Sequence, residues 1–159
     1  MKLKFYLTAF TFLIFFYPAL AQNENKQLAD LLNSYYNIKN ALVSGDQQAA
    51  STNALTFLKT ANTIDYKIIS EGNINIIVEQ AGKISESNSI EDQRNYFSGL
   101  SGNMITIVKN FRITKTPVYE VYCPKKKVSW LSSEKTIQNP YYGSAMLDCG
   151  EVKEIIYPK

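Results

Sequence analysis

The stretch Ser89–Phe111 reads SIEDQRNYFSGLSGNMITIVKNF, and it decides the expected fold. Its apolar side chains recur at steps of mostly three and four residues, at Ile90, Phe97, Leu100, Met104, Ile107, Val108 and Phe111. This spacing predicts an amphipathic helix that buries one face. Ser89 with Asp92 three residues later is close to the capping pattern of a helix start, and Pro117 prevents the helix from continuing.

Three further helices are expected before this stretch. Residues 23–43 carry apolar side chains three and four apart, and Gly45 ends that pattern. Residues 46–61 have an alanine-rich face that lets a neighbouring helix approach closely. Residues 74–84 contain a β-branched run, so a strand competes there, but the spacing favours a helix. The fold class predicted is mainly α, with a four-helix bundle over residues 22–113.

The composition changes at Thr114, and residues 114–159 are rich in proline, tyrosine and lysine. Residues 118–122 and 127–131 have the character of short strands that could pair across the lysines. Met146–Ile156 fits either a short helix or a strand. We expect this segment to pack on the bundle within the same domain, and an α+β fold is the alternative to the mainly α class.

The N-terminus has the three parts of a secretory signal. Lys2 and Lys4 precede an apolar run over residues 5–17, and a small-residue Ala-x-Ala site ends at Ala21. This order predicts a signal peptide over residues 1–21, cleaved after Ala21, and a secreted, periplasmic protein whose mature form does not span a membrane. Cleavage would lower the net charge from +3 to +1, which gives no reason to expect a nucleic-acid partner.

The chain contains no histidine. This excludes Ser-His-Asp and Cys-His catalysis and every zinc site that uses an imidazole ligand. Two cysteines cannot form a four-cysteine zinc site within one chain. No phosphate-binding loop, serine nucleophile elbow or dinucleotide motif is present. The sequence therefore predicts a protein that is not an enzyme.

Cys123 and Cys149 leave two possibilities open. In an oxidising compartment, two cysteines separated by 26 positions predict a disulfide. Met146, three residues before Cys149, adds a thioether to the two thiols. Thiolate and thioether are soft ligands that select Cu(I) or another thiophilic metal, so Cys123, Met146 and Cys149 are also candidate metal ligands.

Several motifs resemble a bacterial family of secreted domains of unknown function. The resemblance covers residues 28–153 and rests on Tyr36-x-x-x-x-Ala41-Leu42, Glu91-Asp-Gln-Arg94-x-x-Phe97-x-x-Leu100-Ser101, Tyr119-x-x-Tyr122-Cys123-Pro124, Trp130-Leu-Ser132 and Asn139-Pro-Tyr-Tyr-Gly143-Ser-x-Met146-Leu-x-Cys149-Gly-Glu-Val152. Members of that family also occur fused to CusB-like periplasmic adaptor proteins of heavy-metal efflux systems.

This resemblance implies copper or another heavy metal as the ligand, and heavy-metal efflux or other envelope proteins as partners. It favours the hypothesis that Cys123, Met146 and Cys149 are metal ligands. The family has Cys-Pro-Met where this chain has Cys123-Pro124-Lys125, so one soft donor of the family is replaced by a lysine. The expected function is non-enzymatic binding of a Cu(I)-type metal in metal handling or efflux. The alternative is a disulfide-stapled structural or protein-interaction domain without metal.

Overall fold

The structure is a computed structural model that describes residues 18–111 and 114–158. Residues 1–17 of the expected signal peptide lie outside the described part. Four helices come first: α1 (Pro18–Ser44), α2 (Gln47–Ala61), α3 (Glu71–Glu86) and α4 (Ile90–Phe111). All four predicted helices are therefore confirmed, with ends that differ from the expected ones by a few residues.

The third helix shows which of two sequence signals prevails. Ile74, Ile77, Ala81 and Ile84 of α3 are buried, and they lie three and four residues apart. This spacing places them on one helix face, so burying them outweighs the strand preference of β-branched residues. The strand alternative for this segment is wrong.

The helix ends follow from local chemistry. Gly45 ends α1 with a φ of 74°, a conformation that costs glycine little. The Asp46 side chain then accepts a 2.9 Å hydrogen bond from the Ala49 amide at the start of α2. Ser89 accepts a 3.3 Å hydrogen bond from the Asp92 amide at the start of α4, as the capping pattern predicts.

The C-terminal segment forms a three-stranded antiparallel sheet. Its strands are β1 (Val118–Cys123), β2 (Val128–Ser132) and β3 (Glu151–Ile156), in the order β2-β1-β3. The predicted pairing of the first two strands across the lysines is confirmed. The undecided stretch from Met146 onward becomes a strand only at Glu151, and it is preceded by a short 3-10 turn, η1 (Gly143–Ala145).

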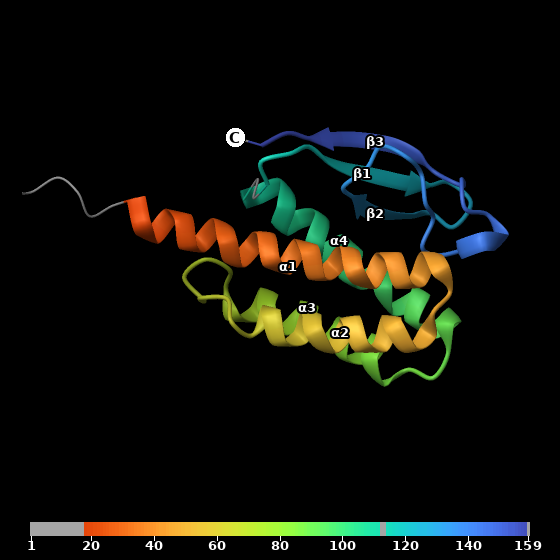
Figure 1. Cartoon of the computed structure of the whole chain (residues 1–159), viewed down its shortest axis with the longest axis horizontal. Coiled ribbons are helices and arrows are strands. Elements are labelled where there is room, and N and C mark those ends of the chain that lie inside the picture. Colours follow the sequence, from red (N-terminus) through yellow and green to blue (C-terminus); the bar gives the residue numbers. More distant parts are fainter. Residues whose placement is uncertain (1–17, 112–113, 159) are drawn as a thin grey trace, which may run out of the picture.

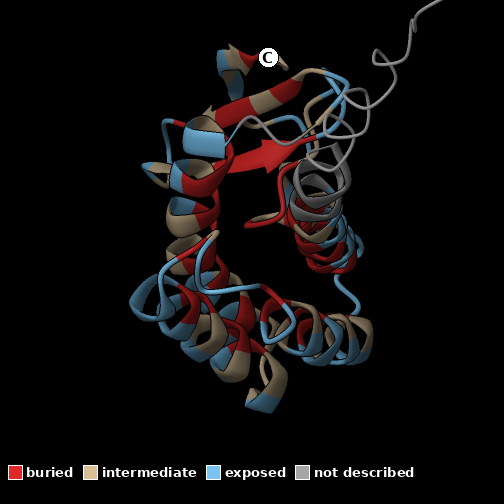
Figure 2. Cartoon of the chain, turned by 90° about the vertical axis from the view of Figure 1, so that its left-hand side faces the viewer, coloured by how far each residue is buried: buried red, intermediate tan, exposed pale blue. Residues whose placement is uncertain are grey.

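The sheet covers the side of the bundle where α1 and α4 lie, and α2 and α3 form the opposite side (Figures 1 and 2). Buried residues line the inner faces of both parts, and one core joins them (Figure 2). Tyr35 of α1 stacks on Phe97 of α4 with ring centroids 5.0 Å apart. Tyr141 contacts both Phe97 and Trp130 of β2, each at 5.9 Å between centroids. The mainly α class with a small β part is confirmed.

Over residues 18–111 and 114–158, no helix combines the length and apolar character needed to cross a membrane.

Candidate metal centre

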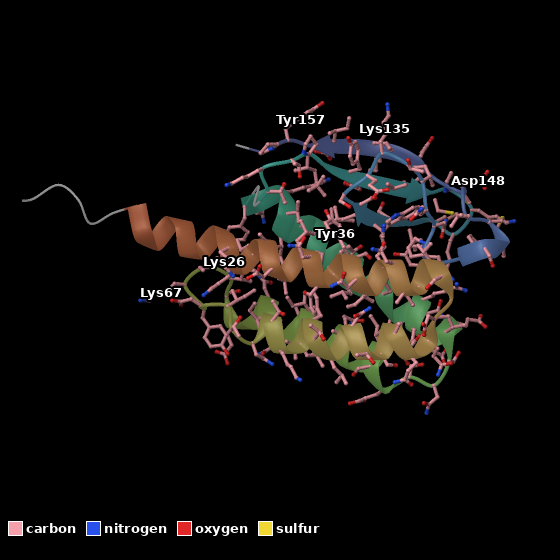
Figure 3. The ribbon with its side chains drawn as sticks, viewed as in Figure 1. Lys26, Tyr36, Lys67, Lys135, Asp148 and Tyr157 are labelled. Atoms are coloured by element: carbon pink, nitrogen blue, oxygen red, sulfur yellow. The ribbon has the colours of Figure 1, made fainter. Side chains whose placement is uncertain are left out.

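The two cysteines meet at one end of the sheet. Cys123 is the last residue of β1, and Cys149 lies two residues before β3. Their Sγ atoms are 2.9 Å apart, and no disulfide joins them. Cys123 is buried and Cys149 is half-buried. In Figure 3, the neighbouring residue Asp148 marks this end of the molecule, far from Lys26 and Lys67 at the other end.

The turn between β1 and β2 holds the Cys123 sulfur. The Lys127 amide donates a 2.8 Å hydrogen bond to the Cys123 carbonyl, and Lys127 adopts a φ of 59° to close the turn. Burial alone would raise the pKa of the Cys123 thiol. Hydrogen bonds from Cys149, from the backbone amides of Lys126 and Lys125, and from the Asn139 side chain outweigh burial and lower that pKa. This turn therefore favours the thiolate form of Cys123, which is the form that a metal ligand would need.

Cys149 has the opposite tendency. Its hydrogen bond to Cys123 is the largest cause that raises the pKa of the Cys149 thiol, and burial adds to it. The positive charge and the backbone amide of Lys125 act against this rise. The two pKa shifts have opposite directions, so Cys123 is the thiol of the pair that loses its proton more readily.

Met146 lies at the C-terminal end of η1, and Lys125 links it to the thiols. The Lys125 ammonium is 3.4 Å from the Met146 Sδ atom, and Lys125 lies two residues after Cys123 in the turn between β1 and β2. The Cys149 amide also donates a 3.3 Å hydrogen bond to the Met146 carbonyl. The structure thus brings the two thiols into contact and places the Met146 sulfur against the side chain of Lys125. The ligand role of all three remains a prediction.

A buried asparagine fixes the loop that carries Met146 and Cys149. The Asn139 Oδ1 atom accepts hydrogen bonds from the Tyr141 and Tyr142 amides, at 2.7 and 3.1 Å. Its Nδ2 atom donates a 2.6 Å hydrogen bond to the Cys149 carbonyl. One side chain therefore closes a turn at one end of the loop and holds the cysteine at the other.

Trp130 packs beneath the second cysteine. A Cβ atom on Gly150 would lie 2.8 Å from the indole carbon Cη2, so the backbone after Cys149 approaches the ring too closely for a side chain. Trp130 is fully buried. Trp130 therefore packs directly against the backbone that follows Cys149.

Arg94 is a positioning residue that the sequence does not identify. Its Nη2 atom donates a 2.9 Å hydrogen bond to the Leu42 carbonyl near the end of α1, where a positive charge also complements the helix dipole. Gly143 packs directly on the same guanidinium group. Arg94 thereby joins α4, α1 and η1. Its place in the motif Glu91-Asp-Gln-Arg94 was a signal in the sequence, but the motif does not indicate that Arg94 binds a carbonyl of α1.

The donor set decides which ion the site would suit. Within the described residues, no group of three or more histidine, cysteine, aspartate or glutamate side chains is placed to hold a metal. Cys123, Cys149 and Met146 offer two thiols and one thioether, a set that suits a soft ion of low coordination number.

Comparison with protein-family models places the helical part of the chain in a family. Residues 31–116 match the model described as Protein of unknown function (DUF3347), which spans most of the helical part and ends before β1 and both cysteines. No curated protein and no solved structure matches the chain. Because the matched range covers more than half of the sequence, the chain belongs to the DUF3347 family of proteins of unknown function.

Proposed function

We propose that this protein binds a soft, thiophilic metal ion of the Cu(I) type, without catalysing a reaction. Cys123, Cys149 and Met146 would hold the ion. The observation that carries the proposal is the contact of the two thiols at 2.9 Å, with Met146 next to the turn that holds them.

The thiols need little movement to accept an ion. With metal–sulfur distances of about 2.3 Å and angles of about 110–120°, two sulfur ligands lie about 3.8–4.0 Å apart. The observed separation of 2.9 Å must therefore widen by about 1 Å. Cys149 lies outside the strands and is only half-buried, so its loop can supply this movement. Binding would release the thiol protons, because thiolates are the ligands.

The proposed setting is the bacterial envelope. The N-terminal pattern supports secretion to the periplasm after cleavage near Ala21, and the resemblance to domains fused to CusB-like adaptors supports a role in metal handling or efflux. Under this proposal, the partners are heavy-metal efflux or other envelope proteins.

A titration with Cu(I) tests the metal proposal. The reduced protein is titrated against a competing Cu(I) chelator, alongside the variants Cys123→Ser, Cys149→Ser and Met146→Leu. We expect each serine variant to lose about 100-fold or more in affinity, and the leucine variant to lose about tenfold, because soft donors are removed.

Met104→Leu is the matched control, since it removes a buried thioether that lies in α4. It should leave the affinity unchanged. Equal affinity in the wild-type protein and in the Cys123→Ser and Met146→Leu variants would show that the ion is not held at this site.

The 2.9 Å separation also favours a second candidate function, a disulfide-stapled structural or protein-interaction domain. A disulfide has a sulfur–sulfur distance of about 2.05 Å, so the atoms would approach by less than about 1 Å. Oxidation removes two electrons and two protons from the pair, and a disulfide donor that is itself reduced to two thiols can accept them. Closing this loop would stabilise the fold by about 3–4 kcal/mol.

Free thiols distinguish the two candidates. In protein isolated from an oxidising compartment without reductant, two titratable thiols per chain would support the metal site, and none would support the disulfide. Two free thiols together with tight Cu(I) binding would establish the metal site. No free thiols together with no Cu(I) binding would establish the disulfide.

A further inference from the structure

We propose that Lys125 makes the candidate metal centre selective for monovalent soft cations, such as Cu(I) and Ag(I), over divalent ones. This inference rests on the proposed function. The Lys125 ammonium lies 3.4 Å from the Met146 sulfur and 6.0 Å from the centroid of the Tyr142 ring. The same residue lies two positions after Cys123, in the turn between β1 and β2.

The selectivity follows from the total charge of the occupied site. Two thiolates with a monovalent cation carry a net charge of −1, which the ammonium group of Lys125 neutralises. Two thiolates with a divalent cation are already neutral, so the same ammonium leaves an excess of +1. A positive charge next to the candidate ligand Met146 therefore stabilises the monovalent complex relative to the divalent one.

The surroundings of Lys125 leave its charge available for this role. Among the described residues, no ion pair of Lys125 is found, and its ammonium contacts a thioether and an aromatic ring instead of a carboxylate. Asp148 and Glu151, the acidic residues that flank Cys149, are exposed to water, as Lys125 is, and neither forms an ion pair with Lys125 among the described residues. Salt therefore screens all three charges, and the effect of Lys125 is largest at low salt.

Lys126 offers a matched comparison in the same turn. Its ammonium donates a 3.2 Å hydrogen bond to the Asn95 Oδ1 atom on α4. Lys126 therefore carries the same charge as Lys125 and follows it directly in the sequence, but its ammonium binds Asn95. Removing either charge changes the net charge of the protein equally, but only one of the two ammonium groups contacts the candidate ligand Met146.

The experiment compares two ions in four proteins. The affinities of the reduced wild-type protein and of Lys125→Gln, Lys125→Arg and Lys126→Gln are measured for Ag(I) and for Cd(II) by competition with chelators. We expect Lys125→Gln to lower the Ag(I)/Cd(II) affinity ratio by about tenfold at low salt. Lys125→Arg should keep the wild-type ratio, and Lys126→Gln should change it by less than about twofold.

The possible failures are distinguishable. An unchanged ratio in Lys125→Gln, or an equal fall in Lys126→Gln, would overturn the role of Lys125 while leaving metal binding intact. If the wild-type protein binds neither ion, both this inference and the proposed function are overturned. Circular dichroism of each variant establishes that the fold is retained, so that a change in the ratio reports on the site.

Discussion

Glu120 is a charged residue that the fold buries almost completely. Its side chain is 2% exposed, and its carboxylate pairs with Lys109 of α4 at 2.5 Å and with Lys153 of β3 at 2.7 Å. In the pairing of β1 with β3, Glu120 is opposite Glu154 while Val121 is opposite Val152, so Lys153 has no partner in the register. This irregularity accompanies the turn of the Lys153 side chain toward Glu120.

The pKa of Glu120 makes this network sensitive to acid. Burial alone would raise the pKa, but the hydrogen bonds from Lys109 and Lys153 outweigh burial and lower it. A carboxylate whose pKa is lower in the folded state stabilises the protein above its unfolded-state pKa of about 4.3. That contribution is lost as the pH falls through the folded-state value.

We predict that Glu120→Gln lowers the free energy of unfolding by about 2 kcal/mol near neutral pH, because charged hydrogen bonds are lost from a buried site. The difference between wild-type and variant should shrink as the pH falls below about 5. Urea unfolding at a series of pH values measures this. Glu154→Gln is the control, since its 49% exposed carboxylate also pairs with Lys109 and should cost less than about 1 kcal/mol. A difference that grows toward acid pH would contradict the interpretation.

At the scale of single elements, η1 depends on one glycine. Gly143 has a φ of 54°, and a side chain there would collide with the Arg94 guanidinium and lie 3.0 Å from the Val43 carbonyl oxygen. The short turn therefore packs directly against the end of α1 and against α4. Met146 follows it in the sequence.

Gly45 provides a direct comparison, because it has a φ of 74° but no atom within 4 Å of an added Cβ. We predict that Gly45→Ala costs about 1 kcal/mol, for backbone strain alone. Gly143→Ala should cost about 2–3 kcal/mol, since steric overlap is added to the strain. Thermal unfolding of both variants tests the difference. Equal losses would show that the contact with Arg94 relaxes at no cost.

The elements differ in how well the sequence predicts them, and the reason is where their stabilisation comes from. The four helices were predictable, because each buries a stripe of apolar residues whose spacing is visible in the sequence. The segment 146–156 was not, because its strand pairs with β1, and the η1 turn before it packs on Arg94 and on the Val43 carbonyl. These partners are distant in sequence, so no local pattern reveals them.

The candidate site was also predictable only in part, because some of its contacts depend on the fold. With only two cysteines in the chain, their pairing needed no knowledge of the fold, and the structure places them in contact. The contact of Lys125 with Met146 depends on the turn that closes with Lys127 in a left-handed conformation. A run of three lysines suggests only a solvated hairpin tip.

At the scale of the whole molecule, Tyr35 connects the helices to the sheet. Its hydroxyl accepts a 3.1 Å hydrogen bond from the Leu131 amide of β2 and is 2.8 Å from the Ser101 hydroxyl of α4. All three residues are buried. One hydroxyl on α1 therefore satisfies a buried backbone donor in the sheet, which makes the sheet and the bundle depend on one another.

Removal of that hydroxyl tests the dependence. Tyr35→Phe leaves the buried Leu131 N–H without its acceptor, so we predict a loss of about 1–3 kcal/mol in the free energy of unfolding. Tyr36→Phe is the matched control, because the Tyr36 hydroxyl is buried without a hydrogen-bond partner among the described residues. Its removal should leave the stability unchanged or raise it slightly.

The form of the transition shows whether the two parts unfold together. Trp130, the single tryptophan, reports on the sheet, and far-ultraviolet circular dichroism reports on the helices. Because one buried core joins both parts, we expect the two signals to give the same urea midpoint in the wild-type protein and to shift together in Tyr35→Phe. If the tryptophan signal shifted alone, the sheet would unfold separately, and the hydroxyl of Tyr35 would stabilise only its attachment to the bundle.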